Sequence, residues 1–155
     1  MNDQQNDLIK IAETNGKILG VDFGDTRTGL AVSDPSRLLA SGIGYISPGG
    51  IEKTADAVAE IAREQRVVAL VVGLPVNMDG SEGARAVRCR KFAGMLEERL
   101  SLPVAMYDER MTTMTAARYL NETNTRGKKR KGVIDTLSAQ IILQNCMDRL
   151  KYLKG

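Results

Sequence analysis

The chain has 155 residues, of which 43% are hydrophobic and 26% are charged, and its net charge at pH 7 is +3. Such a length and composition are typical of a single globular domain with a real core. A charge this small argues against a protein that coats DNA. No apolar run approaches the roughly 20 residues that span a bilayer. The polar N-terminus is unlike a secretory signal, so we expect a cytoplasmic protein without membrane contact.

Histidine is absent and there are two cysteines. The absence of imidazole excludes Ser–His and Cys–His catalysis and histidine-bound zinc. An enzyme of this composition must use carboxylates, lysines or a bound metal, and carboxylate oxygens favour Mg²⁺ or Mn²⁺. Cys89 and Cys146 both fall in helical patterns, which predicts buried thiols in a reducing compartment rather than a disulfide.

The first third of the chain predicts three strands. Residues 1–16 are polar and are expected to form a flexible tail or a short, weak helix. The strands that follow are connected by short turns and should pair antiparallel; they are predicted over residues 17–24, 28–34 and 38–47.

The rest of the chain alternates helices and strands. Helices are predicted over residues 51–65, 81–100, 112–122 and 133–152, and strands over 66–75 and 102–109. Ser81 is a helix-start signal. Strands separated by helices should run parallel. We therefore expect one α/β domain over residues 17–152, with a mixed five-stranded sheet covered by helices on both faces.

Positive charge is concentrated in the second half of the chain. Residues 1–80 contain 7 Lys and Arg against 11 Asp and Glu, and residues 81–155 contain 15 against 8. RGKKRKG, residues 126–132, is the densest cluster. Such a cluster favours a polyanionic partner, although a solvated surface is the alternative. Residues 123–132 should be a mobile loop in the absence of nucleic acid.

Three acids are candidates for a metal site. Asp22 interrupts an apolar strand, Glu109 ends the last strand, and Asp135 begins the last helix. A buried lone carboxylate is costly unless something offsets its charge. If the first strand is central and the later strands run parallel to it, the three carboxylates can converge. A divalent cation, or a pair of them, would then offset their mutual repulsion.

Each acid also has an alternative role. Asp22 could brace a turn, and Asp135 could stabilise the first turn of its helix through the helix dipole. Asp25 could reach a metal, but an Asp in a turn normally accepts bonds from nearby backbone. Asp108 and Glu109 are adjacent in a strand and must point to opposite faces, so only one can face the site.

Several blocks together resemble one family. GVDFGDTRTGLAVSD, VVGLPVNMDGSEG, KFAGMLEERL, YDERMTT and GVIDTLSAQIILQ are similar to the blocks of the YqgF family, in the same order, over most of residues 17–147. Members are described as Holliday junction resolvases and as pre-16S rRNA nucleases. The resemblance implies an RNase H-like fold and metal-dependent phosphodiester hydrolysis. It also places Asp22, Glu109 and Asp135 at the family's acid positions.

Basic residues and backbone amides are the candidates for phosphate binding. Gly24 and Gly29 would permit close backbone approach near Asp22, and the helix that starts near Ser81 could bind an anion. Arg27 either binds a phosphate or pairs with an acid, and Arg110 is expected in a structural ion pair. The expected nucleic-acid-binding residues are Arg27, Arg85, Arg88, Lys128, Lys129, Arg130 and Lys131.

The predicted function is hydrolysis of structured nucleic acid with two Mg²⁺ or Mn²⁺ ions held by Asp22, Glu109 and Asp135. The resemblance favours processing of the 5′ end of pre-16S rRNA, with the small ribosomal subunit as a partner. Resolution of branched DNA and metal-independent binding in ribosome assembly are the alternatives. A third alternative is a phosphate loop like that of actin and sugar kinases, which hold nucleotide between two such domains. The protein is expected to be a monomer or a weak homodimer.

Overall fold

Five strands form one mixed sheet in the order β3-β2-β1-β4-β5. The structure, a computed structural model, describes the backbone of residues 3–109 and 127–154 and the side chains of 6–109 and 132–153. The strands are β1 Ile18–Phe23, β2 Thr28–Ser33, β3 Ala40–Ile46, β4 Ala69–Leu74 and β5 Val104–Asp108. β1, β2 and β3 pair antiparallel, and β4 and β5 run parallel to β1. The predicted sheet and its central first strand are therefore confirmed.

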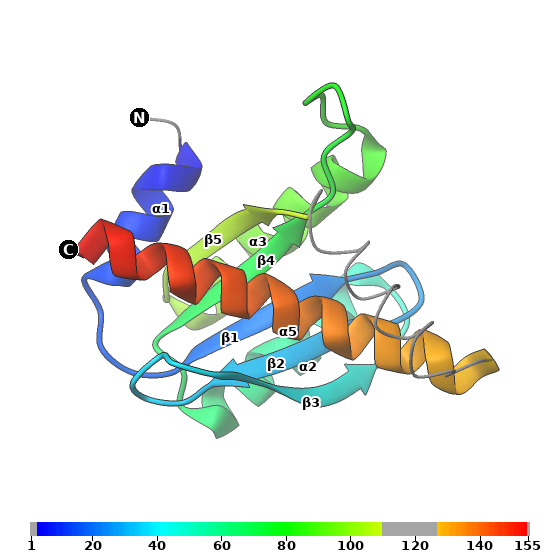
Figure 1. Cartoon of the computed structure of the whole chain (residues 1–155). Helices are drawn as coiled ribbons and strands as arrows, with labels where there is room; N and C mark the ends of the chain where they lie inside the picture. The colour runs from blue at the N-terminus through cyan, green and yellow to red at the C-terminus, as the bar shows by residue number, and fades with distance from the viewer. Residues whose placement is uncertain (1–2, 110–126, 155) are drawn as a thin grey trace.

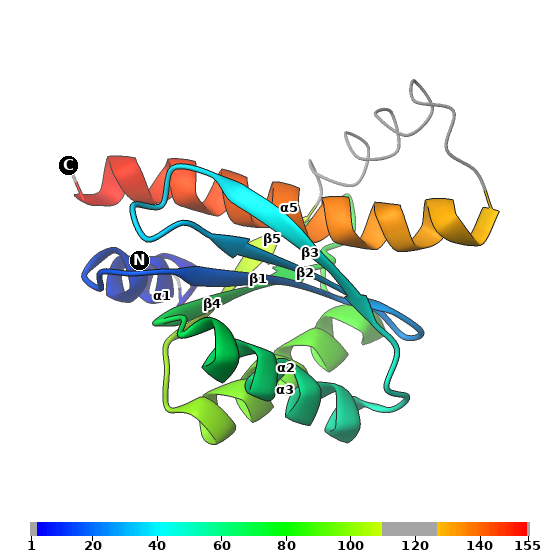
Figure 2. The ribbon, with the colours of Figure 1, turned by 90° about the horizontal axis from the view of Figure 1, so that it is seen from below.

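Helices cover both faces of the sheet (Figures 1 and 2). α2, Ile51–Gln65, and α3, Ala84–Leu100, lie on one face. α5, Gly127–Lys154, crosses the other face, with α1, Asp3–Ala12, beside its C-terminal end. Within the described ranges, no helix has the length and apolar character needed to cross a membrane.

The two faces of the sheet differ in side-chain size because residues alternate along each strand. The face toward α2 and α3 presents Leu19, Val21, Phe23, Leu30, Leu70, Val72 and Leu74. The face toward α5 presents mostly glycine and alanine: Gly20, Gly29, Ala31, Gly42, Ala69, Gly73 and Ala105. A Cβ added at Gly20 would lie 2.7 Å from Cβ of Leu143. The small residues thus let α5 lie directly on the sheet.

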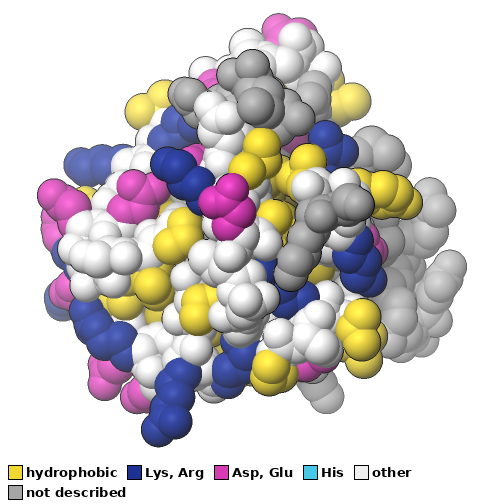
Figure 3. All heavy atoms as spheres, turned by 90° about the vertical axis from the view of Figure 1, so that its left-hand side faces the viewer, with side chains coloured by type: hydrophobic (Ala, Val, Ile, Leu, Met, Phe, Trp, Pro, Cys, Tyr) yellow, Lys and Arg dark blue, Asp and Glu magenta, His cyan; other side chains and the backbone are white. Residues whose placement is uncertain are grey.

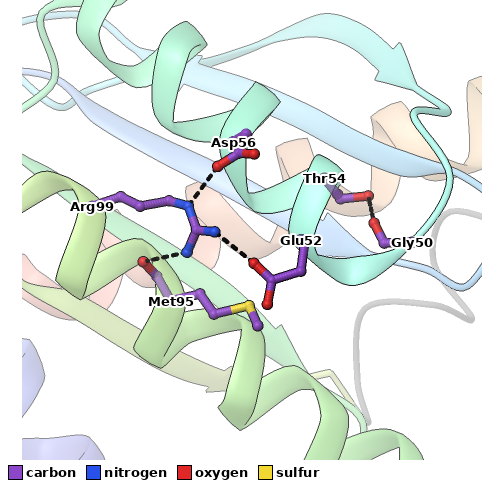
Figure 4. A network of polar contacts seen from close by, with 6 residues as sticks. All are labelled: Gly50, Glu52, Thr54, Asp56, Met95 and Arg99. Carbon is purple, nitrogen blue, oxygen red and sulfur yellow. Dashed lines mark hydrogen bonds and ion pairs between the residues drawn. The ribbon is translucent and has the colours of Figure 1, made fainter.

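Arg99 joins the two helices of the opposite layer (Figure 4). Its guanidinium on α3 donates to the carboxylates of Asp56 and Glu52 on α2, at 2.7 and 2.8 Å.

The core beneath α3 contains a stacked pair of aromatic rings. Phe92 is fully buried and stacks on Phe23 at a centroid distance of 4.1 Å. The predicted burial of Cys89 and Cys146 is confirmed, one in each layer.

The N-terminal segment takes the second of its two expected forms, a short helix instead of a flexible tail. Asp3–Ala12 forms α1, and Leu8 and Ile11 are buried against the α5 layer. The guanidinium of Arg37 donates to the carbonyl oxygens of Ile11 and Gly16, at 3.0 and 2.7 Å. These contacts come from distant parts of the chain, and the local polarity of residues 1–16 gives no sign of them.

Two predicted boundaries differ from those in the structure. Residues 127–132, assigned to a basic loop, form the first turns of α5 because the helix continues past the end of the sheet. α3 begins at Ala84 after Gly83, while Ser81 donates to the Asp79 carboxylate within a preceding turn. The predicted helix over 112–122 and the loop over 123–126 lie outside the described residues.

We expect Gly29→Ala to destabilise the protein by about 1–3 kcal/mol or more, the usual cost of overpacking. The added Cβ would overlap the carbonyl oxygen of Asp135, which is backbone and has no free direction in which to move. Urea denaturation followed by circular dichroism measures the change.

Gly94→Ala is the matched control. Gly94 is exposed within α3, and an added Cβ there would have none of the described residues within 4 Å, apart from its own helix. Because alanine favours helix over glycine, this variant should be as stable as wild type or more stable by up to about 1 kcal/mol. Equal stability of Gly29→Ala and wild type would contradict the close approach of α5.

Candidate metal and nucleic-acid site

Asp22 lies between two glycines on neighbouring strands. It pairs with Gly29 of β2 across the antiparallel ladder. On the other side, the register of Val21 with Val72 brings Gly73 of β4 level with Asp22. Neither neighbour carries a side chain on this face, so other groups can approach the Asp22 carboxylate from both sides.

The carboxyl group of Glu109 lies over Gly73. Its backbone N–H donates to the carbonyl oxygen of Leu74 at 3.1 Å, which extends the parallel ladder past the end of β5. A Cβ on Gly73 would lie 2.7 Å from the carboxyl carbon of Glu109. The Glu109 and Asp22 carboxyl groups are hydrogen-bonded to each other. Glu109 therefore meets Asp22, in agreement with the alternation argument that only one of Asp108 and Glu109 can face the site, and with the family resemblance that selects Glu109.

Asp135 reaches the same pocket from α5 but has a partner of its own. Its backbone carbonyl sits on Gly29, directly beside Asp22. Its carboxylate accepts a hydrogen bond from Nε of Arg27 at 2.7 Å. Among the described residues, no three acidic, histidine or cysteine side chains are grouped closely enough to hold one metal ion. The structure thus joins two of the three predicted acids and turns the third toward Arg27.

Burial governs the ionisation of the joined pair. Desolvation, together with the charge of Asp22, raises the pKa of Glu109 to about 9. Desolvation also raises the pKa of Asp22, and the charge of Asp135 adds to this. The hydrogen bond to Glu109 opposes the rise in the pKa of Asp22, as does the nearby cation Arg85. At neutral pH the pair therefore shares a proton, carried by Glu109 and donated to Asp22.

A pocket of about 360 Å³ opens over these acids. Its lining residues are Asp22, Pro75, Val76, Met78, Arg85, Glu109, Ile134, Asp135 and Ser138. Arg85, from the first turn of α3, is a cation that faces the pair, and its charge lowers the pKa of both Asp22 and Glu109. Acids at the floor and a cation at the rim suit a phosphate bridged to a metal.

Arg88, another residue predicted to bind nucleic acid, has partners of its own. Nε of Arg88 lies 3.6 Å from the Asp25 carboxylate, and its guanidinium lies over the Phe23 ring. Asp25 is thus an exposed partner of Arg88 on the β1–β2 turn and does not line the pocket. Lys128, Lys129, Arg130 and Lys131 lie in the first turns of α5, and Arg110 falls outside the described residues.

Neither positive nor negative charge is concentrated at the end of the molecule opposite to the acidic pocket. Figure 3 views the side where β1, β4 and β5 begin, and there Lys and Arg alternate with Asp and Glu. The acidic pocket instead lies at the carboxyl ends of these strands, the usual position of sites in open α/β sheets. The end of the sheet that carries the pocket is also where α5 begins with its basic turns.

Sequence reasoning identified the close approach at Gly24 and Gly29 but missed Gly73. Gly73 is the one glycine in the β-branched run RVVALVVGL, and a lone glycine in a strand signals close approach of another group. The predicted close backbone approach at Gly24 and Gly29 is confirmed, because a Cβ on Gly24 would overlap the Arg27 carbonyl oxygen and one on Gly29 the Asp135 carbonyl oxygen. The groups that approach these two glycines belong to the protein's own backbone.

The donor set fits a hard divalent cation. Asp22 and Glu109 supply adjacent carboxyl oxygens, which are hard donors of the kind that such a cation prefers. The third carboxylate, Asp135, lines the same pocket. Cys89, a thiol close enough to sense the charges of both acids, has its pKa raised to about 12 by burial, so it offers no thiolate to a softer metal.

Comparison with a protein-family model gives a match over residues 16–149, to the family described as RuvX, Holliday junction resolvase. A relative from Pelotomaculum thermopropionicum is 44% identical over 133 residues, covering 85% of this chain and 86% of its own. One from Cereibacter sphaeroides is 40% identical over 153 residues, covering 99% and 96%. Both carry the name "Putative pre-16S rRNA nuclease".

Solved structures share the fold. The RuvC protein of Thermus thermophilus in complex with a Holliday junction substrate is similar with a TM-score of 0.54 and 16% identity, over 86% of this chain and 95% of that one. The fowlpox virus Holliday junction resolvase is similar with a TM-score of 0.51 and 10% identity, over 83% and 98%. The predicted RNase H-like architecture is therefore confirmed.

We expect the stability of the metal-free protein to fall as pH rises from about 4.5 to about 9. Over this range the unfolded chain has lost the Glu109 proton and the folded chain keeps it, so higher pH favours unfolding. One such proton contributes a slope of at most about 1.4 kcal/mol per pH unit. Urea denaturation in EDTA at a series of pH values measures it.

Glu109→Gln should flatten this slope because the amide stays neutral in both states. Glu98→Gln serves as the control, since Glu98 is exposed at the other end of α3 from Arg85. An unchanged slope in Glu109→Gln would show that the Asp22–Glu109 pair does not hold the proton.

Proposed function

This chain belongs to the RuvX family of Holliday junction resolvases, and on that premise we propose that it is a metal-dependent nuclease that cuts structured nucleic acid. This family is also named YqgF. The observation that carries the proposal is the hydrogen-bonded Asp22–Glu109 pair at the floor of a pocket rimmed by Arg85. A buried acid pair weakens the fold, and a function that needs both carboxylates explains its presence.

Asp22 and Glu109 would hold Mg²⁺ or Mn²⁺, with Asp135 as a third ligand. The bound cation would supply Lewis acidity and lower the pKa of an attacking water. As ligands, Asp22 and Glu109 would both have to be deprotonated. Asp135 would have to leave its partner Arg27 to join them, and Arg27 would then be available to a phosphate oxygen.

The basic side chains position the substrate. Arg85 faces the acids and would hold the scissile phosphate, which the acids alone would repel. Lys128, Lys129, Arg130 and Lys131 in the first turns of α5 would contact the phosphate backbone without reading sequence. In the reaction, the water would give up a proton as its oxygen bonds to phosphorus, the bond to the 3′ oxygen would break, and the departing oxygen would take up a proton, so that no net proton is consumed.

Pre-16S rRNA is the substrate we propose first, with cleavage during ribosome biogenesis near the 5′ end. The names of relatives at 40–44% identity support it. A Holliday junction is the second candidate, and the description of the family model favours it. Both candidate substrates contain base-paired strands, next to a branch point in the Holliday junction and next to a flanking segment in the rRNA precursor. The protein would act in the cytoplasm as a monomer or weak dimer, and on rRNA it would meet the small ribosomal subunit.

Asp22→Asn should reduce cleavage by at least roughly 100-fold, because the variant loses a carboxylate ligand at the centre of the pocket. The fold should be retained, since the asparagine oxygen still accepts the hydrogen bond from Glu109. Cleavage of a hairpin pre-rRNA fragment and of a four-way DNA junction, each with Mg²⁺, Mn²⁺ or EDTA, measures the effect and compares the two substrates.

Asp148→Asn is the control, because Asp148 is exposed near the other end of α5 and should be dispensable. Wild-type cleavage rates in Asp22→Asn would refute the proposed site. Metal-independent, salt-sensitive binding without cleavage of either substrate would favour an assembly factor instead.

Arg27→Gln should bind Mn²⁺ more tightly, with the half-saturating concentration about two- to fivefold lower. Arg27 competes with a cation for the Asp135 carboxylate, so its removal frees a ligand. The metal-dependent rise in melting temperature measures binding without reference to cleavage. Arg149→Gln removes an equal charge at an exposed position and should bind Mn²⁺ like wild type. An unaltered half-saturating concentration in Arg27→Gln would indicate that Asp135 takes no part in metal binding.

A further inference from the structure

A second pocket lies on the opposite side of α5 from the acids. It has a volume of about 410 Å³, within the range of roughly 300–1,000 Å³ usual for ligand sites. Its lining residues are Gly44 and Tyr45 of β3 and Gly132, Val133, Thr136 and Leu137 of α5. The acidic pocket uses Ile134, Asp135 and Ser138 of the same two turns. At about 100° per residue these two sets face opposite sides of the helix.

We propose that this second pocket binds a nucleobase of the substrate strand, an inference that rests on the proposed nuclease function. The Tyr45 side chain supplies the aromatic surface, because Tyr45 is 50% exposed. One edge of the ring lies against Gly132, where an added Cβ would lie 2.5 Å from Cε1 of Tyr45. A half-exposed aromatic ring is a platform on which an unpaired base can stack.

The surroundings favour a base over other apolar ligands. Of the residues that the structure describes, no acidic one lines this pocket, so its described walls do not repel a phosphodiester strand. The four consecutive basic residues of the sequence immediately precede Gly132 on the same helix. A polyanionic strand is therefore drawn to the part of α5 that carries the pocket.

The separation of the two pockets suits one continuous strand. Both pockets adjoin the same helix, whose diameter with side chains is about 10–12 Å. A strand that crosses α5 at roughly 3.4 Å per stacked nucleotide covers this width in about three nucleotides. A base a few positions from the scissile phosphate can thus enter the Tyr45 pocket while the phosphate lies over Asp22 and Glu109.

The test measures binding in EDTA, so that it does not depend on cleavage. The probes are hairpin RNAs with single-stranded flanks, each carrying one abasic site, and the flank positions are scanned by fluorescence anisotropy. Wild type should lose affinity by roughly 5- to 100-fold when the abasic site falls at the base that enters the pocket. Tyr45→Leu should bind all the probes alike, and Tyr45→Phe should keep the wild-type pattern because it keeps the ring.

Tyr152→Leu is the matched control, because Tyr152 is 87% exposed near the C-terminal end of α5 and should keep the wild-type pattern. An abasic penalty that persists in Tyr45→Leu would overturn the inference. So would a wild-type protein that binds every probe alike, or a Tyr45→Leu change confined to the oligomeric state. This test measures binding and not cleavage. If Asp22→Asn cleaved nucleic acid at the wild-type rate, the proposed metal site would be refuted, but the binding result for Tyr45 would still hold.

Discussion

The absence of two side chains beside Asp22 is the constraint on which the site depends. Gly29 lets the backbone of α5 come into contact with β2, and Gly73 lets the Glu109 carboxyl lie over β4. A single methyl group at either position would occupy the space that an acid or its backbone now takes. The acids meet because the strands beside Asp22 leave room, and the strand register sets where that room lies.

The two acids that the proposed chemistry requires, Asp22 and Glu109, are also residues whose burial destabilises the fold. Burial makes the Asp22–Glu109 pair retain a proton well above the usual pKa of a carboxyl group. Such a pair is unfavourable for the fold unless a cation or a proton offsets its charge. The rest of the sheet compensates with apolar layers on both faces, where large residues face α2 and α3 and small ones face α5.

α5 organises the functional end of the molecule. One stretch of this helix carries Asp135 toward the acids and forms, on its other side, a wall of the Tyr45 pocket. The preceding turns contain the densest positive charge in the sequence. The basic turns of α5, the acidic pocket and the Tyr45 pocket therefore all adjoin one helix. The distances between them are set by helix geometry rather than by loops.

Local patterns predicted most of the helices and strands and indicated which acids are candidates for the site. Turn residues and apolar, β-branched runs predicted the five strands, and helical spacing of apolar residues predicted the helix over residues 51–65. The adjacency of Asp108 and Glu109 correctly assigned only one of them to the site. The sequence by itself also indicated the two buried thiols and the concentration of positive charge in the second half of the chain. These features depend on neighbours close in the chain, where residue type alone sets the preference.

Tertiary structure decided which groups meet. It packed the polar N-terminal segment as a helix, extended α5 through the expected basic loop, and paired Asp135 with Arg27. It also gave Gly73 its role, since the clearance above a strand depends on what crosses it from the next strand. Contacts between residues such as Arg27 and Asp135, 108 positions apart, follow from strand order and helix packing, which local sequence preferences do not encode.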